Sequence, residues 1–276
     1  MPAHDFDWPQ LTGLIALGFG VGAIGTLIGA GGGFILLPVL LLLFPDMGPG
    51  TLTAISLGVV FINASSGSIA YARLKRIDYR SGIQFALAGL PGALIGAYLT
   101  SYIPRRLFDV VLGVLLIAIA VFLLMRPHYQ RKAAAENSRF RATRSLTDDQ
   151  GHTYGYAFSW LTGVLLSFVV GFVSSLLGIG GGIIHVPILT TLLHFPVPIA
   201  TATSHFILAI MALAGTIVHV ARGDLHNGWH TLLAIGGGIV VGAQVGAYWS
   251  HRMQPHWIVR ALALALLLVG VRIIFA

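Results

Sequence analysis

The chain has 276 residues, of which 56% are hydrophobic and only 9% are charged, and its mean hydropathy is +0.87. A soluble domain carries about 25% charged residues because its surface faces water, so this composition predicts a surface that mostly faces lipid. The net charge of +7 would suit nucleic acid, but ten of the 16 basic residues lie within 73–80 and 126–144, between apolar segments. That placement is typical of cytoplasmic loops and argues against nucleic-acid binding.

Eight apolar stretches follow one another along the chain. Residues 1–10 contain no Lys or Arg and so lack the basic region of a signal peptide, which predicts that the first stretch stays in the mature protein. Six stretches have the length of one membrane-crossing helix, about 20 residues. The first and the fifth are too long, because 34 residues would form a helix of about 51 Å, and a glycine cluster predicts a break in each. The stretches are 11–44, 51–72, 80–103, 107–125, 157–195, 200–221, 228–249 and 256–275.

A polar stretch of mixed charge, residues 126–156, separates a first half, 1–125, from a second half, 157–276. It predicts a cytoplasmic linker that is partly helical around 132–137. Three motifs recur in the same order in the two halves, at offsets of 148 to 150 residues, and this predicts a duplication. Gly29–Gly33 with Pro38 recurs as Gly178–Gly182 with Pro187, Thr53–Ser56 as Thr201–Ser204, and Gly92–Tyr98 as Gly242–Tyr248.

The fold class that follows is an all-α, polytopic transmembrane bundle of two homologous repeats, each with a broken or re-entrant glycine-rich helix. If each long stretch returns to the side where it begins, the second half is inverted; if each crosses once, the halves are parallel. Loop charges do not separate the two schemes, which differ only at Arg222, Arg252 and the N-terminus. We favour inversion, because broken helices paired across an inverted repeat recur among transporters.

The glycine clusters are the first candidate site. Backbone that leaves a helix at membrane depth must be buried in protein or line a cavity. N–H groups freed at the positive end of a half-helix would bind an anion without any cation. The alternative is that the glycines only let helices pack closely. Equivalent positions in both halves favour an anion site, and we expect the clusters to meet around one cavity near the bilayer midplane. The candidate ligands are Gly31, Gly32, Gly33, Gly180, Gly181 and Gly182.

These motifs resemble the sulfite exporter TauE/SafE family of membrane permeases. The resemblance is carried by Gly29–Gly33 with Pro38, by Gly178–Pro187 and by Pro91–Gly96, and it extends roughly over 11–125 and 157–275. It implies a multi-pass permease of the bacterial inner membrane for sulfite or an organosulfonate, with export as the favoured direction. No ligand set of the family carries over beyond the glycine motifs.

Polar side chains that follow the clusters are the second candidate. Ser56, Asn63 and Ser66 lie near one face of the helix predicted for 51–72 and would donate hydrogen bonds to an oxyanion. In the second half, Thr201 and Ser204 belong to the motif that matches Thr53–Ser56, and we add them to the site. The alternative is hydrogen bonding between helices, worth about 0.6 kcal/mol for each bond.

Three histidines lie inside apolar stretches of the second half. An ionisable residue within the membrane suggests a function, and imidazole suits proton coupling. We place His205, which follows Ser204 directly, at the substrate site. The alternative is a neutral histidine bonded to a backbone carbonyl. The histidines are His185, His205 and His219, and their first-half counterparts are Leu36, Leu57 and Tyr71.

No acidic or basic residue lies at the centre of an apolar stretch, which favours an anionic or neutral cargo held by dipoles. The sequence has no cysteine, carboxylate pair, nucleophile–base arrangement or metal motif, so we expect no enzyme, metal or cofactor. The expected partners are a small anion and the lipid bilayer, and a homo-oligomer is compatible with them. Two alternatives stay open. One is an anion channel-like pore, and the other is a membrane scaffold, whose glycine clusters would be tightly packed and dry.

Overall fold

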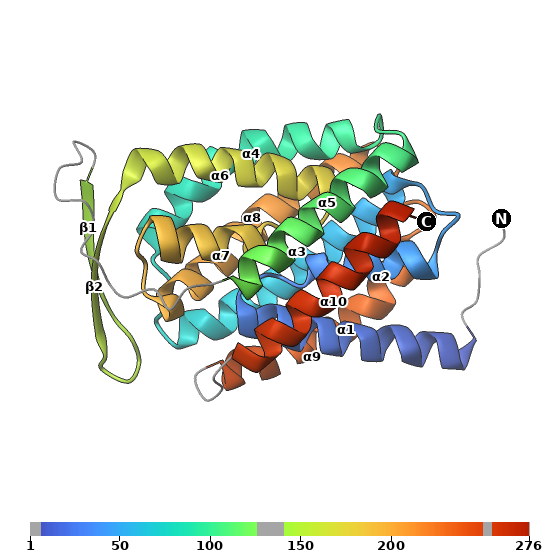
Figure 1. Cartoon of the computed structure of the whole chain (residues 1–276). Helices are drawn as coiled ribbons and strands as arrows, with labels where there is room; N and C mark the ends of the chain where they lie inside the picture. Colours follow the sequence, from blue (N-terminus) through green and yellow to red (C-terminus); the bar gives the residue numbers. More distant parts are fainter. Residues whose placement is uncertain (1–6, 126–140, 251–255, 276) are drawn as a thin grey trace.

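Figure 1 shows the computed structural model, a helical bundle with one strand hairpin at its end. It describes residues 7–125, 141–250 and 256–275, except for the side chains of 123 and 256–262; the helix expected around 132–137 lies outside them. The first-half helices are α1 Trp8–Ile28, α2 Gly33–Leu43, α3 Pro49–Arg73, α4 Tyr79–Thr100 and α5 Arg105–Leu124. Then follow β1 Arg141–Thr147, β2 Thr153–Ser159, α6 Trp160–Leu177, α7 Gly182–Pro187, the π-helical turn η1 Ile188–Leu192, α8 Val197–Ala221, α9 Trp229–Trp249 and α10 His256–Phe275.

Six helices within the described residues are long and apolar enough to cross a membrane: α1, α3, α4, α6, α8 and α9. The predicted helical, multi-pass membrane protein is therefore confirmed. Helices α5 and α10, which the sequence also predicts as crossings, have side chains that are only partly described. Large apolar side chains stay exposed on the outer faces of α4 and α9, as lipid contact requires. Examples are Leu87, Leu94, Leu233 and Val241.

Glycine stripes set the closest helix pairs, α1 with α9 and α6 with α4. A Cβ added at Gly242 or Gly246 of α9 would overlap a backbone carbonyl oxygen of α1. In the same way, a Cβ at Gly92 or Gly96 of α4 would overlap a carbonyl oxygen of α6. These glycines let backbones approach directly, which stabilises helix pairs where lipid removes the hydrophobic driving force. In the repeated motif Gly92–Tyr98 and Gly242–Tyr248, the glycines therefore serve close helix packing.

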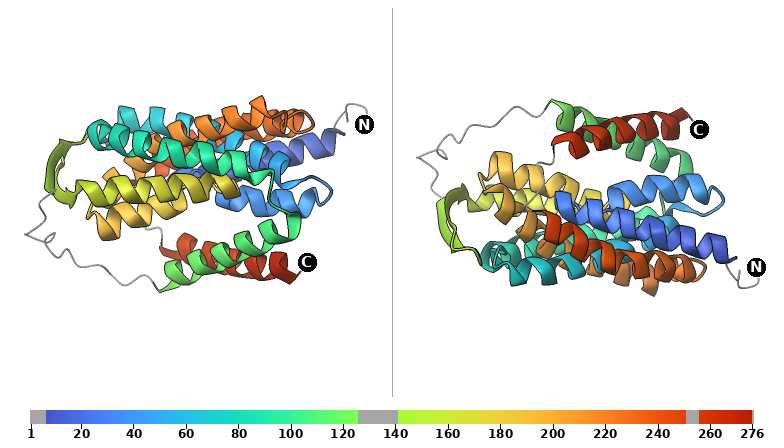
Figure 2. Two further views of the ribbon diagram at one scale, coloured as in Figure 1. Left: turned by 90° about the horizontal axis from the view of Figure 1, so that it is seen from above. Right: turned by 90° about the horizontal axis from the view of Figure 1, so that it is seen from below.

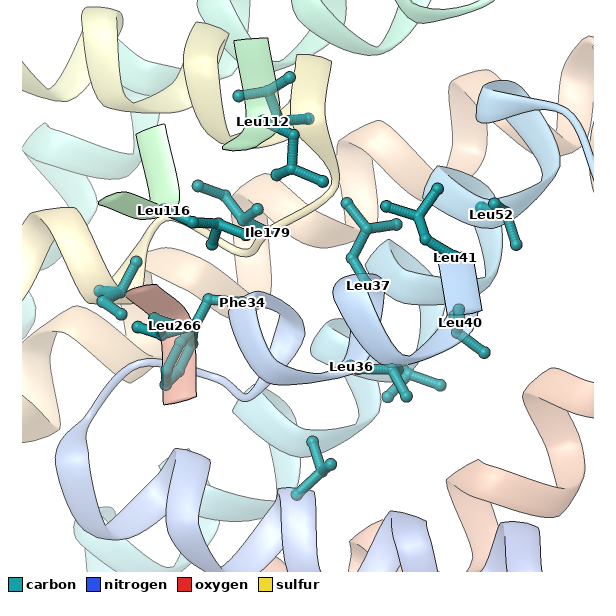
Figure 3. Packing of buried hydrophobic residues seen from close by; sticks show 14 of the residues in the cluster. Phe34, Leu36, Leu37, Leu40, Leu41, Leu52, Leu112, Leu116, Ile179 and Leu266 are labelled. Atoms are coloured by element: carbon teal, nitrogen blue, oxygen red, sulfur yellow. The ribbon is translucent and has the colours of Figure 1, made fainter. Parts of the chain in front are cut away.

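The apolar core surrounds α2. Figure 2 shows α5 and α10 as a separate pair on one side of the bundle, and Figure 3 shows their leucines beside those of α2. Phe34 and Leu37 of α2 and Leu112 of α5 are fully buried in this cluster. α2 has apolar residues on every face and packs on α3, and its contact with α10 shows that the α5–α10 pair also helps to bury it.

The loops gather at two opposite ends of the bundle (Figure 1). At one end, Gly50 lies against Asp224, and Arg105 Nη1 donates a 2.6 Å hydrogen bond to the Met47 carbonyl. The other end carries the α3–α4 loop, residues 74–78, and the β1–β2 hairpin. α1 and α2 both have their outer ends at the first end, whereas α6 and η1 have theirs at the hairpin end.

The β1–β2 hairpin was not foreseen from the sequence, which predicts only a linker here. Its two strands pair in antiparallel register from Arg141–Ser159 to Thr147–Thr153. Buried Asp148 in its turn accepts a 3.2 Å hydrogen bond from Arg76 of the α3–α4 loop. Burial alone would raise the pKa of Asp148, but backbone N–H groups of the turn and the Arg76 guanidinium outweigh it and lower that pKa. The hairpin is therefore attached to the bundle end by an ion pair.

Candidate functional site

Both long apolar stretches are interrupted at their glycine clusters. α1 ends at Ile28 because Gly29 takes a positive φ of 84°, and Gly31 and Gly32 follow with φ of 75° and 80°. In the second half, Gly178 and Gly180 have φ of 65° and 67°. Glycine adopts this conformation without the steric cost that other residues carry. Residues 29–32 and 178–181, here called the glycine loops, thus leave the helix because of their sequence.

The two glycine loops are in direct contact with each other. A Cβ at Gly33 would lie 2.6 Å from the Ile179 carbonyl oxygen, and one at Gly182 would lie 2.6 Å from the Gly29 carbonyl oxygen. Gly180 also packs on Val60, near the middle of the 25-residue helix α3. The loops therefore meet at half the height of α3. All the loop glycines are buried, so the described residues leave the expected cavity between the clusters closed.

Hydroxyl groups of α3 and α8 hold each loop in place. Ser56 Oγ donates a 2.5 Å hydrogen bond to the Gly178 carbonyl oxygen, and Ser204 Oγ donates a 3.4 Å bond to the Gly29 carbonyl oxygen. Thr201 packs against Gly29. Three of the predicted site residues thus lie at the loops, but in this structure the two serine hydroxyls are bonded to loop carbonyls.

Asn63 is the predicted residue with an unused hydrogen-bond donor. Its side chain is fully buried in α3, and its Oδ1 accepts a 2.9 Å hydrogen bond from Thr26 Oγ1. Its Nδ2 has no partner among the described residues. A Cβ at Gly32 would lie 3.6 Å from that nitrogen, so the free donor is close to the first glycine loop and the start of α2. Buried donors without partners are uncommon, and each needs an explanation.

His205 packs against Gly67, one helical turn after Asn63 on α3. It is fully buried, and a Cβ at Gly67 would lie 3.1 Å from its Nε2. Its ring meets that of Tyr71 edge to face at 5.5 Å between centroids, and the Tyr71 hydroxyl donates a 2.9 Å hydrogen bond to the Thr26 carbonyl. Backbone carbonyls lie alongside the imidazole, yet neither ring nitrogen makes a well-aligned hydrogen bond within the described part of the chain.

Thr26, Asn63, Gly67, Tyr71 and His205 thus form one buried cluster beside the start of α2, here called the polar cluster. The second half has Met211 where the first has Asn63, and the first half has Leu57 where the second has His205. The equivalent place therefore lacks both the amide and this imidazole, although it has Ser175 and His219 where the first has Thr26 and Tyr71. Thr26 and Tyr71 were missed from the sequence, although Thr26 stands just before the first glycine cluster.

Ser66 and His219 lie away from the glycine loops, whereas His185 follows the second loop directly and its backbone N–H donates to the Gly181 carbonyl. Ser66 Oγ donates a 3.1 Å hydrogen bond to the Val240 carbonyl of α9. His185 Nε2 lies 3.2 Å from Ser167 Oγ, and His219 Nδ1 lies 2.8 Å from an Asp224 oxygen at the bundle end. Within the described residues, no three His, Cys, Asp or Glu side chains are grouped as a metal ion would need.

Comparison with known proteins agrees with this architecture. The profile of the family "Sulfite exporter TauE/SafE" matches residues 14–273. The chain is 34% identical to "Probable membrane transporter protein YunE" of Bacillus subtilis, covering 95% of this chain and 96% of the relative. It is 30% identical to a probable membrane transporter protein of Methanocaldococcus jannaschii, over 78% of this chain and 75% of the relative. No solved structure matches the chain.

Proposed function

The chain belongs to the sulfite exporter TauE/SafE family of membrane transporters, and on that premise we propose that it exports a small sulfur-containing anion, sulfite or an organosulfonate. The observation that carries the proposal is the polar cluster at the start of α2, where a buried amide donor has no partner. A multi-pass protein of the bacterial inner membrane provides the setting for this transport.

The start of α2 has the electrostatics that an oxyanion needs. Gly33 and Phe34 are the first residues of this 11-residue helix, so their N–H groups have no acceptor within it. The helix dipole places about half a positive charge there, and the free Nδ2 of Asn63 lies beside it. Three oxygens of a sulfite or sulfonate group would accept from these donors, with no buried cation needed.

A second part of the proposal concerns topology. We propose that the two halves are inverted repeats and that α1–α2 and α6–α7 are re-entrant hairpins. Equivalent contacts support the two-fold relation of the halves, since Gly29 packs on Thr201 as Gly178 packs on Thr53. The proximity of Gly50 to Asp224 supports the inversion, because inverted halves bring the α2–α3 and α8–α9 loops to one side.

Cysteine labelling tests the inverted topology in this cysteine-free chain. We expect Asp46→Cys and Asn227→Cys to react with a membrane-impermeant maleimide from the periplasm only, because both lie in loops at the same bundle end. Asn227 is preferable to Asp224, whose carboxylate bonds to Ser101 and His219. Labelling of the two positions from opposite sides of the membrane would support parallel halves instead.

Tight packing of the glycine loops is the feature expected of a non-transporting scaffold, so it must be reconciled with the proposed transport. Membership in a transporter family argues for movement of a solute. The unpaired Asn63 amide argues likewise, since a purely structural contact would have been satisfied or replaced by an apolar residue. We therefore interpret the structure as a closed state in which the loops must separate to admit the anion.

Flux into proteoliposomes tests the function directly. We expect the purified protein to carry radiolabelled sulfite or sulfoacetate, with saturation at high concentration and competition between the two anions. Protein-free liposomes of the same lipid composition are the control for leakage. Failure of every sulfur anion to cross would contradict the proposal, and a flux that rises linearly without saturation would favour the channel-like pore.

His205 provides the pH dependence that we predict for transport. A protonated imidazole would add a second donor and a charge attractive to the anion, so transport should rise as pH falls towards its pKa. Tyr71 is the titratable group that faces the ring. We expect His205→Leu, which copies Leu57 of the first half, to remove this rise in a flux assay that extends from pH 8 down to pH 4. A variant with unchanged rate and unchanged pH profile would leave His205 a structural role.

A further inference from the structure

A groove of about 640 Å³ runs along the outer side of the bundle between α3 and α9. It extends from Arg73 at the last residue of α3 to Phe61 near the middle of that helix. Its wall on the α9 side includes Gln244. The groove thus connects the end of the bundle that carries the basic α3–α4 loop with the height at which the glycine loops meet.

The groove has a strip of polar residues among apolar ones. Ser65, Ser66, Arg73 and Gln244 line it together with Phe61, Ile62, Ile69 and Val240. The positions that match the two serines and the glutamine in the other half, on α8 and α4, are Leu213, Ala214 and Leu94. Leu213 and Leu94 are exposed, as side chains facing acyl chains should be. Since exposing hydroxyl and amide groups to hydrocarbon is costly, the groove between α3 and α9 suits water or a polar ligand instead.

The positive charge of Arg73 at the groove opening indicates that a polar ligand of the groove is an anion. Arg73 is exposed and has no ion pair with any side chain that the structure describes. By contrast, Arg76 in the following loop is buried and paired with Asp148. A free guanidinium at the opening of a low-dielectric groove raises the local concentration of anions and matches an oxyanion with two parallel donors.

The floor of the groove is closed by hydrogen bonds between α3 and α9. Gln244 Nε2 donates to both the carbonyl oxygen and the Oγ of Ser66, each at 2.8 Å, and Ser66 Oγ donates to the Val240 carbonyl. Asn63 of the polar cluster lies three residues before Ser66, about one helical turn away. These side-chain bonds therefore join α3 to α9 about one helical turn from the polar cluster.

We infer that this groove is the cytoplasmic vestibule through which the anion reaches the polar cluster. Arg73 captures the anion, and the Gln244–Ser66 contact is the barrier that opens for its passage. The inference rests on the proposed function, because it takes the transported anion as the ligand. It accounts for the strip of polar residues in the groove and for the leucines at the equivalent positions of the other half.

Cysteine accessibility in the otherwise cysteine-free chain tests the vestibule. Ser65→Cys and its apolar counterpart Leu213→Cys are compared in inside-out vesicles, using an anionic, sulfonate-bearing methanethiosulfonate and a neutral reagent of similar size. A thiol ionises and reacts only where water reaches it, so we expect modification at Ser65→Cys and little at Leu213→Cys. Sulfoacetate should slow the reaction at Ser65→Cys several-fold.

Arg73→Gln in the Ser65→Cys background distinguishes attraction of the reagent by the Arg73 charge from access of water to residue 65. We expect the anionic reagent to react about three- to tenfold more slowly and the neutral reagent to react unchanged. Arg80→Gln, which removes an exposed charge from α4 at the same bundle end, is the matched control and should alter neither rate. In flux assays, Arg73→Gln should raise KM and leave kcat nearly unchanged.

Several results would overturn the inference. Equal reactivity at Ser65→Cys and Leu213→Cys would mean that the groove is not a water-filled path, even if the protein transports sulfur anions. Reaction at Ser65→Cys without protection by sulfoacetate would exclude the transported anion as its ligand. Protection that appears only when phosphatidylglycerol is added to zwitterionic lipid would identify a lipid headgroup as the occupant. The flux assay on the unmodified protein reports separately on the proposed function.

Discussion

Gly182→Ala should reduce transport at least tenfold and lower the thermal stability of the protein. Gly182 has no positive φ, so the backbone conformation itself tolerates alanine. The added Cβ, however, would lie 2.6 Å from the Ala30 Cα and from the Gly29 carbonyl oxygen, which are backbone atoms of the other glycine loop. Neither can rotate away, so the closed contact between the loops cannot form, and a transport cycle that must pass through this closed state is interrupted. Overpacking of this kind costs about 1–3 kcal/mol of unfolding free energy.

Gly20→Ala is the matched control for Gly182→Ala. Gly20 lies within α1, and a Cβ there meets no atom within 4 Å. Its replacement should leave flux unchanged and stabilise the helix slightly, by about 0.5–1 kcal/mol. Melting temperature in detergent and flux in proteoliposomes provide the two readouts. If Gly182→Ala melts and transports like the wild type, contact between the loops is not needed for either property.

Asn63→Met should lower transport about 10- to 100-fold while the protein still folds. The second half has a methionine, Met211, at the position that matches Asn63. The bundle therefore already contains this side chain at the equivalent place in α8. The substitution removes the one amide donor that we assign to the anion. A hydrogen bond to a charged group contributes about 1.5–3 kcal/mol, and each 1.4 kcal/mol corresponds to a factor of ten in affinity.

Asn63→Asp sharpens this prediction. Aspartate keeps the size of the side chain and can still accept the Thr26 hydrogen bond, but it replaces the donor by a negative charge. We expect it to transport less than Asn63→Met, with both proteins eluting as single species in size-exclusion chromatography. Wild-type flux in Asn63→Met would show that the amide does not contact the anion, and the polar cluster would then have to be assigned another role.

The sequence by itself determined the membrane setting and the local structure. A chain with so few charged residues and such long apolar stretches must expose most of its surface to lipid. Most helices also begin and end within a few residues of the predicted limits. The breaks at Gly29 and Gly178 were also predictable, because consecutive glycines favour conformations that other residues avoid and a 34-residue helix would be too long. These features depend only on neighbours along the chain.

Only the tertiary structure decided which polar groups come together. Ser66 shares a helix face with Asn63 in the sequence, yet it bonds to α9, because the packing of α9 on α3 directs that face towards Val240. The hairpin of 141–159 depends on Arg76, about 70 residues away, which no local pattern indicates. Contact between the glycine loops, the unpaired Asn63 amide and the groove beside Gln244 likewise arise from atoms brought close by packing between distant helices.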